Sequence, residues 1–111
     1  MRTQIKQLFE LQEMDLVVAE SQILHQQTKG AQHDIEALRQ RIHALRSSVP
    51  SPLLQRYDKL RKNGLAVAEE KHGVCNACRL TLPVGDLNRM HRGTAHWVCP
   101  NCSRFLLLSE Q

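Results

Sequence analysis

The sequence predicts an α+β fold with a long N-terminal coiled-coil helix, a short second helix and a C-terminal ribbon of short antiparallel strands. The first observation is that residues 3–46 contain no proline and one glycine, and repeat apolar side chains with a period of 3.5 residues. The second is that all four cysteines lie in the last third of the chain, as two Cys-x-x-Cys pairs. We therefore divide the chain into a coiled-coil helix at 1–46, a linker with the short helix at 47–64, and the ribbon at 65–111.

The long helix carries a heptad repeat. Eight of its ten a and d positions are apolar, and Ser21 and Thr28 are the exceptions. The repeat passes through Gly30 without a slip, which favours one continuous helix of roughly 66 Å at 1.5 Å per residue. Two shorter helices folded back at residues 27–30 are the alternative. The side chains that we expect to mediate helix association are Met14, Val17, Leu24, Ile35, Leu38, Ile42 and Leu45.

Such a helix has no partner of comparable length in the rest of the chain, which offers only a short helix and a small ribbon. We therefore expect the protein to be a homo-oligomer, most simply a dimer. Further apolar side chains near the N-terminus lie off the heptad seam and leave room for a four-helix arrangement. These are Leu8, Leu11, Leu16, Val18 and Ile23.

Pro50 and Pro52 end the long helix, because proline lacks an N–H group and disfavours helical geometry in the residue before it. The second helix begins at Ser51 and ends at Asn63-Gly64.

In the ribbon we expect strands at 65–68 and 105–108, a turn at 69–73 and a helical turn at 86–90. Its apolar side chains are too few for independent stability, so metal binding and folding should be coupled.

The two cysteine pairs predict a metal site with the ligands Cys75, Cys78, Cys99 and Cys102. Two thiolates separated by two residues can reach one ion, and the 20 residues between the pairs suit a four-thiolate zinc site. A closed shell of four thiolates leaves no coordination position for water. We therefore expect one structural zinc ion per chain and no catalysis at the metal.

Iron is the alternative metal, because a rubredoxin-type site uses the same cysteine pairs. Such a site usually has glycine after the second cysteine of each turn, where Arg79 and Ser103 stand here. A disulfide framework is disfavoured because residues 1–10 are polar and charged, unlike a signal peptide, which predicts a reducing cytoplasmic location.

The formal net charge of +4 lies entirely in the second part of the chain. Residues 1–46 carry six basic and six acidic side chains, whereas residues 47–111 carry nine basic and five acidic ones. This excess favours contact with nucleic acid or with an acidic protein surface. The candidate contact residues are Arg56, Lys59, Arg79, Arg89, Arg92 and Arg104. The sequence contains no run of eighteen apolar residues, so it predicts no membrane span. No set of residues typical of a catalytic site stands out either, and we therefore expect no enzyme activity.

Residues 49–108 contain VPSPLLQRYDKLRKNGLAVAEEKHGVCNACRLTLP, then DLN and WVCPNCSRFLL. This stretch resembles a bacterial family of coiled-coil proteins that end in a four-cysteine zinc ribbon, and LFELQEMDLVVAES resembles that family's N-terminus. The resemblance implies zinc at the four cysteines and a non-enzymatic protein in which an antiparallel helical hairpin carries the ribbon. It also implies binding to transcription factors or RNA, including in flagellar regulation. Family members have a much longer hairpin, so the short helix here strengthens the prediction of a dimer.

Together these observations predict a regulatory zinc-ribbon adaptor that self-associates through its helix and binds a protein partner. A protein that binds RNA or DNA through its basic ribbon half is the alternative.

Overall fold

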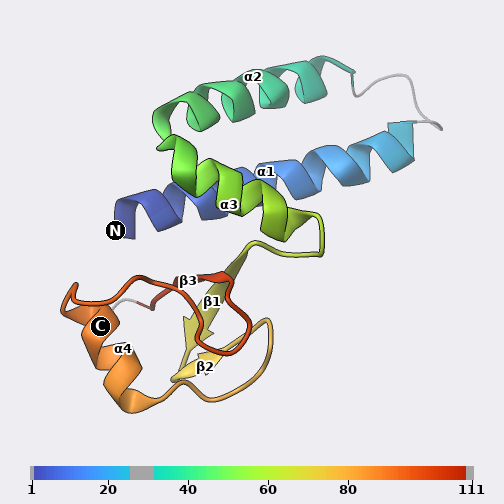
Figure 1. Cartoon of the computed structure of the whole chain (residues 1–111). Helices are drawn as coiled ribbons and strands as arrows, with labels where there is room; N and C mark the ends of the chain where they lie inside the picture. The colour runs from blue at the N-terminus through green and yellow to red at the C-terminus, as the bar shows by residue number, and fades with distance from the viewer. Residues whose placement is uncertain (1, 26–31, 110–111) are drawn as a thin grey trace.

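A computed structural model describes residues 2–25 and 32–109, with side chains described outside 21–25 and 32–34. Helices and a small sheet follow one another along the chain (Figure 1) and confirm the α+β class. The elements are α1 (Arg2–His25), α2 (Gln32–Ser48), α3 (Ser51–Arg61), β1 (Val67–Lys71), β2 (Val74–Cys75), α4 (Val84–His91) and β3 (Phe105–Leu107). None of the described helices is both long and apolar enough to cross a membrane.

The prediction of one continuous N-terminal helix is wrong. α1 and α2 are separate helices that pack against each other and run in opposite directions (Figure 1). The alternative bend at residues 27–30 lies outside the described residues. An unbroken heptad register did not exclude the reversal, because α2 can cover the apolar side of α1 within the same chain. Ser21, Thr28 and Gly30 would also have made the middle of a continuous seam weak.

The buried side of α1 differs from the predicted heptad seam. Val17 is 48% exposed and Met14 is half-buried, whereas the fully buried apolar side chains among those described in α1 belong to its first half. Met14 and Leu45 line one small pocket between α1 and α2. Of the other predicted seam residues, Ile35 is buried, Leu38, Ile42 and Leu45 are half-buried, and the side chain of Leu24 lies outside the described ones.

A single apolar core joins the first half of α1 to α3 and the ribbon. Ile5, Leu8 and Leu11 of α1 have no exposed surface, and they belong to the same cluster as Tyr57 of α3 and Phe105 of β3. This core offsets the small apolar content of the ribbon, because part of the hydrophobic surface that stabilises the ribbon is supplied by α1.

The sheet has the strand order β2-β1-β3, with β1 in the centre. β2 is antiparallel to β1, but β3 is parallel to it, so the prediction of an entirely antiparallel ribbon is wrong for this pair. A parallel pair needs a long crossover connection, and the chain between β1 and β3 supplies one that contains both cysteine pairs and α4.

The first predicted strand lies two residues too early. β1 continues to Lys71, and the turn that was expected at 69–73 is confined to His72 and Gly73. Both have positive φ angles, 56° and 78°, which is the backbone conformation of a two-residue type I′ hairpin. The glycine therefore sits where the hairpin requires a left-handed residue.

Gln12 connects α1 to the central strand. Its side chain is 2% exposed, and its Oε1 accepts hydrogen bonds from the backbone N–H groups of Ala66 and Val67, both at 2.8 Å. Its Nε2 donates to the carbonyl oxygen of Val67 at 3.0 Å. One amide thus satisfies three buried backbone groups at the start of β1. The position of β1 relative to α1 is set by these bonds.

Two further polar contacts connect the helices to each other and to the ribbon. The Tyr57 hydroxyl of α3 donates to the Asp15 carboxylate of α1 at 2.6 Å, and burial together with this bond raises the pKa of Tyr57. Arg2 donates to the carbonyl oxygen of Leu108 at 3.2 Å and lies over the Trp97 ring at 4.8 Å. Helices and ribbon are therefore joined by polar contacts as well as by the core.

Glu70 connects β1 to the end of the described chain. Its carboxylate accepts hydrogen bonds from the N–H of Gly73 at 2.9 Å and from the N–H and hydroxyl of Ser109 at 3.1 and 2.9 Å. Burial opposes ionisation of this side chain, but the hydrogen bonds outweigh burial and lower the pKa of Glu70.

Candidate metal centre

The structure brings the four predicted ligands together. The Sγ atoms of Cys75 and Cys102 are 3.8 Å apart, as are those of Cys78 and Cys99, and all four lie within 4.8 Å of one another. A tetrahedral zinc ion with Zn–S bonds of about 2.3 Å requires sulfur atoms about 3.8 Å apart. The arrangement therefore fits one ion. All four cysteines are free thiols in this arrangement, since bonded sulfur atoms would be about 2 Å apart.

Each cysteine pair is held by the same backbone hydrogen bonds. In the first pair the N–H of Arg79 donates to the carbonyl oxygen of Cys75 at 2.8 Å. In the second pair the N–H of Ser103 donates to that of Cys99 at 2.9 Å. The N–H groups of Cys75 and Cys99 donate in turn to residues five positions further on. The two segments are thus equivalent zinc knuckles.

Arg79 and Ser103 occupy the positions where a glycine would be usual. Both have left-handed backbones, with φ angles of 64° and 65°. The conformation costs a residue with a Cβ atom roughly 1–2 kcal/mol. The knuckle geometry is therefore retained without glycine, which means that the missing glycines do not themselves distinguish zinc from iron.

The first cysteine of each pair is fully buried, and the second is half-buried. Burial raises the pKa of Cys75, and it raises that of Cys99 to about 12. For Cys102, burial acts in the same direction but is outweighed by hydrogen bonds, chiefly from the backbone of Arg104, which lower its pKa to about 7. Two buried thiols that resist ionisation need a cation beside them to become thiolates. This arrangement is consistent with the expected coupling between folding of the ribbon and metal binding, which stays a prediction.

Four sulfur atoms suffice for the tetrahedral coordination shell of a structural zinc ion. Among the described residues, the side chains that lie close enough together to share one metal ion are these four cysteines. A zinc ion held by the four cysteines has no open coordination position for water or substrate, so its role would be to link the two knuckles.

The predicted basic contact residues separate into different parts of the surface. Arg56 and Lys59 line one hollow along α3. The Arg56 guanidinium donates to the carbonyl oxygen of Ser103 at 2.9 Å and lies 5.6 Å from the centre of the Phe105 ring. Arg104 donates to the carbonyl oxygen of Leu65 at 2.7 Å. The second knuckle is therefore bordered by basic side chains from α3 and from the ribbon itself.

The remaining predicted contacts lie elsewhere. Arg89 and Arg92 belong to the α4 end of the ribbon, at a distance from α3 (Figure 1). Arg89 pairs with Asp86, and the Nε of Arg92 donates to the carbonyl oxygen of Asn88 at 3.3 Å. Arg79 is exposed at the first knuckle. The six residues thus do not form one basic patch.

Gln12 was not anticipated from the sequence as a structural contact. A polar residue directly after Leu8 and Leu11 in an apolar stripe was the available signal, but it did not indicate which backbone the amide would meet.

Comparison with known proteins supports the metal centre and the fold. Residues 74–106 match the family model of the C4-type zinc ribbon domain, which confirms the zinc ribbon predicted from the sequence. No curated protein matches the chain in sequence.

The chain also resembles the solved structure of CT398 from Chlamydia trachomatis, with a TM-score of 0.65 and 19% sequence identity. The match covers 82% of this chain and 39% of that one, so this chain spans about two-fifths of the length of CT398. The likeness concerns the fold.

Proposed function

We propose that the protein is a non-enzymatic zinc-ribbon adaptor, which presents the ribbon to a protein partner from a short helical hairpin. The observation that carries the proposal is the combination of a closed four-thiolate site with a ribbon that shares its core with α1. The closed site argues for a structural rather than a chemical role of the metal. The shared core argues that the ribbon surface is held in one orientation. The family resemblance favours a partner in transcription or flagellar regulation.

Self-association is also part of the proposal. The sequence predicted a dimer because the apolar helix lacked a partner helix, but α2 packs against α1 in the same chain and removes that argument. What now supports self-association is the apolar surface left on the hairpin, where Val17 is 48% exposed. Light scattering on the zinc-loaded protein would give about twice the chain mass of 12.7 kDa for a dimer. A mass equal to one chain across micromolar concentrations would contradict this part.

The adaptor is tested by affinity purification of the tagged full chain from its native cell, with bound proteins identified by mass spectrometry. We expect a specific protein partner that is lost with Cys99→Ser, because this substitution removes a metal ligand and with it the ribbon surface. Arg39→Glu, on the exposed surface of α2, should keep the partner. Recovery of no specific partner, or equal recovery with Cys99→Ser, would contradict the proposal.

Nucleic-acid binding is the second candidate, favoured by the basic side chains around the second knuckle. The two aromatic rings of the ribbon offer bases little surface for stacking, because Trp97 and Phe105 are only 6% and 1% exposed. Binding of a labelled single-stranded RNA to the full chain would have to weaken steeply with salt and decrease with Lys59→Glu. Absent or salt-independent binding at low ionic strength would exclude it.

A further inference from the structure

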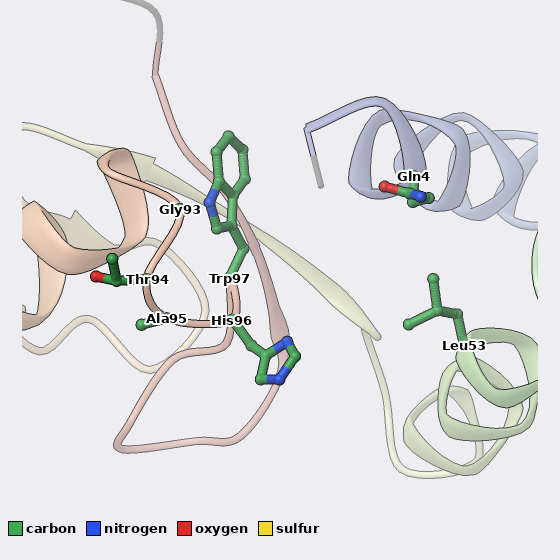
Figure 2. Close-up of a pocket in the computed structure, with 7 residues that line it drawn as sticks. All are labelled: Gln4, Leu53, Gly93, Thr94, Ala95, His96 and Trp97. Atoms are coloured by element: carbon green, nitrogen blue, oxygen red, sulfur yellow. The ribbon is translucent and has the colours of Figure 1, made fainter.

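A groove follows the junction between the helices and the ribbon. Its first part is a hollow of about 480 Å³ between α1, α3 and the loop that follows α4. Figure 2 shows Gln4 and Leu53 on one side of this hollow and residues 93–97 on the other, with the His96 ring directed toward Leu53. A second hollow, of about 400 Å³, shares Leu53 and His96 with the first and extends toward Val98.

A third hollow, of about 490 Å³, shares Arg56 with the second and continues along α3 past Lys59. Because neighbouring hollows have lining residues in common, we treat them as one surface feature. We call it the junction groove. It is defined by Gln4, Leu53, Arg56, Lys59, His96 and Val98.

The middle of the junction groove is apolar. Leu53 comes from α3 and Val98 from the ribbon, and both are half-buried, so each keeps some surface in contact with water. An apolar side chain placed between them would remove surface of both from water, which is the main source of affinity in small binding sites.

The charge of the junction groove is of one sign. Its charged side chains are Arg56 and Lys59, and no carboxylate is found among the described residues that line the three hollows. Asp58, the acidic residue of α3, is paired instead with Arg46 of α2, with an N···O distance of 2.7 Å. Arg56 is held in place by Ser103 and the Phe105 ring. The groove therefore combines an apolar middle with a fixed positive end.

We propose that the junction groove binds a short acidic peptide segment of a partner protein. An apolar side chain of the peptide lies between Leu53 and Val98, and its carboxylates lie beside Arg56 and Lys59. The inference rests on the adaptor function proposed above and names the surface and the chemistry of the partner. Charge complementarity selects the acidic residues. The apolar middle favours a peptide over a nucleic acid, because bases stack on exposed aromatic rings, whereas Leu53 and Val98 are aliphatic and the Phe105 ring is only 1% exposed.

A second copy of the chain is a poor occupant. Stretches that combine acidic and apolar residues include 8–15 of α1, 34–36 of α2 and 67–70 of β1. The apolar side chains of Leu8, Leu11, Ile35 and Val67 in these stretches are buried, so they are not free to enter a neighbour's groove.

The test begins with a phage-displayed library of random dodecapeptides, selected on the immobilised, zinc-loaded full chain. We expect enriched peptides with one aliphatic or aromatic residue flanked by several Asp or Glu residues. An enriched peptide is then synthesised with a fluorescent label, and its Kd is measured by anisotropy. Enrichment of no peptides, or of peptides without acidic residues, would overturn the proposal.

Three variants locate the binding site. Lys59→Glu reverses a charge at the positive end and should raise the Kd about tenfold. Val98→Thr keeps the branched shape but replaces a methyl group by a hydroxyl, and should raise the Kd about threefold to fivefold. Arg39→Glu is the matched charge reversal on α2 and should leave the Kd within about twofold. Zinc content and the circular dichroism spectrum verify that each variant is folded.

Equal weakening by Lys59→Glu and Arg39→Glu would show non-specific charge attraction and overturn the proposal. Displacement of the peptide by single-stranded RNA, with RNA affinity independent of Val98→Thr, would assign the groove to nucleic acid instead. The adaptor function fails separately. If Lys59→Glu still binds a cellular partner, the adaptor function is supported and peptide binding in the junction groove is contradicted. If a peptide binds specifically in the groove but no cellular partner is recovered, the groove is supported and the adaptor function is contradicted.

Discussion

Replacing Gln12 with methionine tests how the hairpin holds the ribbon. The Gln12 amide makes three hydrogen bonds to the backbone of Ala66 and Val67, at 2.8, 2.8 and 3.0 Å, and is almost completely buried. Methionine has a similar length and keeps the apolar stem in place. The substitution therefore removes the hydrogen bonds with little change in packing.

The expected loss follows from the number of backbone groups left without a partner. A typical hydrogen bond contributes about 1 kcal/mol to the free energy of unfolding, and a buried polar group without a partner costs about 1–3 kcal/mol. Three backbone groups are affected, so we expect Gln12→Met to lower the free energy of unfolding by about 3 kcal/mol. Single domains have roughly 5–15 kcal/mol in total, so this loss is large.

The assay is urea unfolding with excess zinc, followed by far-ultraviolet circular dichroism, with Gln7→Met as the control. Gln7 lies on the same helix, is half-buried, and makes one long bond of 3.5 Å to Ser48, so its loss should be below about 0.5 kcal/mol. Hydrogen exchange at the Val67 amide should accelerate in Gln12→Met alone. If the free energy of unfolding of Gln12→Met lies within about 0.5 kcal/mol of the wild-type value, the three hydrogen bonds do not stabilise the contact between α1 and the ribbon as we argue.

Three further predictions concern the metal, the partly buried pair of Tyr57 and Asp15, and pH. Cys99→Ser, or zinc removal by a chelator, should unfold the ribbon and leave helical circular dichroism in the N-terminal part, because zinc supplies on the order of 10–16 kcal/mol of apparent binding energy in comparable domains. A ribbon still protected from hydrogen exchange would contradict this. Tyr57→Phe leaves the Asp15 carboxylate without its hydroxyl donor and should lower the free energy of unfolding by about 1–3 kcal/mol in the same urea assay; no change would indicate that water replaces the donor. The pKa of Glu70 is lowered by folding, so its stabilising effect is complete above its ordinary pKa and is lost as the pH falls through the lower folded value. The difference in Tm between wild type and Glu70→Gln should therefore be full at pH 7 and shrink at acidic pH, and a difference that grows on acidification would refute the assignment.

The metal site was predictable because its information is local. Each cysteine pair places two sulfur atoms within one turn, so the ligands could be read from residue spacing. The helical turn at 86–90 and the closing strand at 105–108 were also found, as α4 and β3. Periodicity and proline positions likewise predicted the second helix, which spans Ser51–Arg61.

By itself, the sequence determined that the N-terminal part is helical, which of its residues are apolar, and that four thiolates meet at one ion. Only the tertiary structure decided what covers each apolar side. A heptad repeat suits a partner helix from the same chain as well as one from another, and α2 turned out to be that partner. The parallel pairing of β1 with β3 and the bonds of Gln12 to β1 likewise join residues far apart in the chain. Spacing along a sequence carries little information on such contacts, because they depend on how whole elements pack.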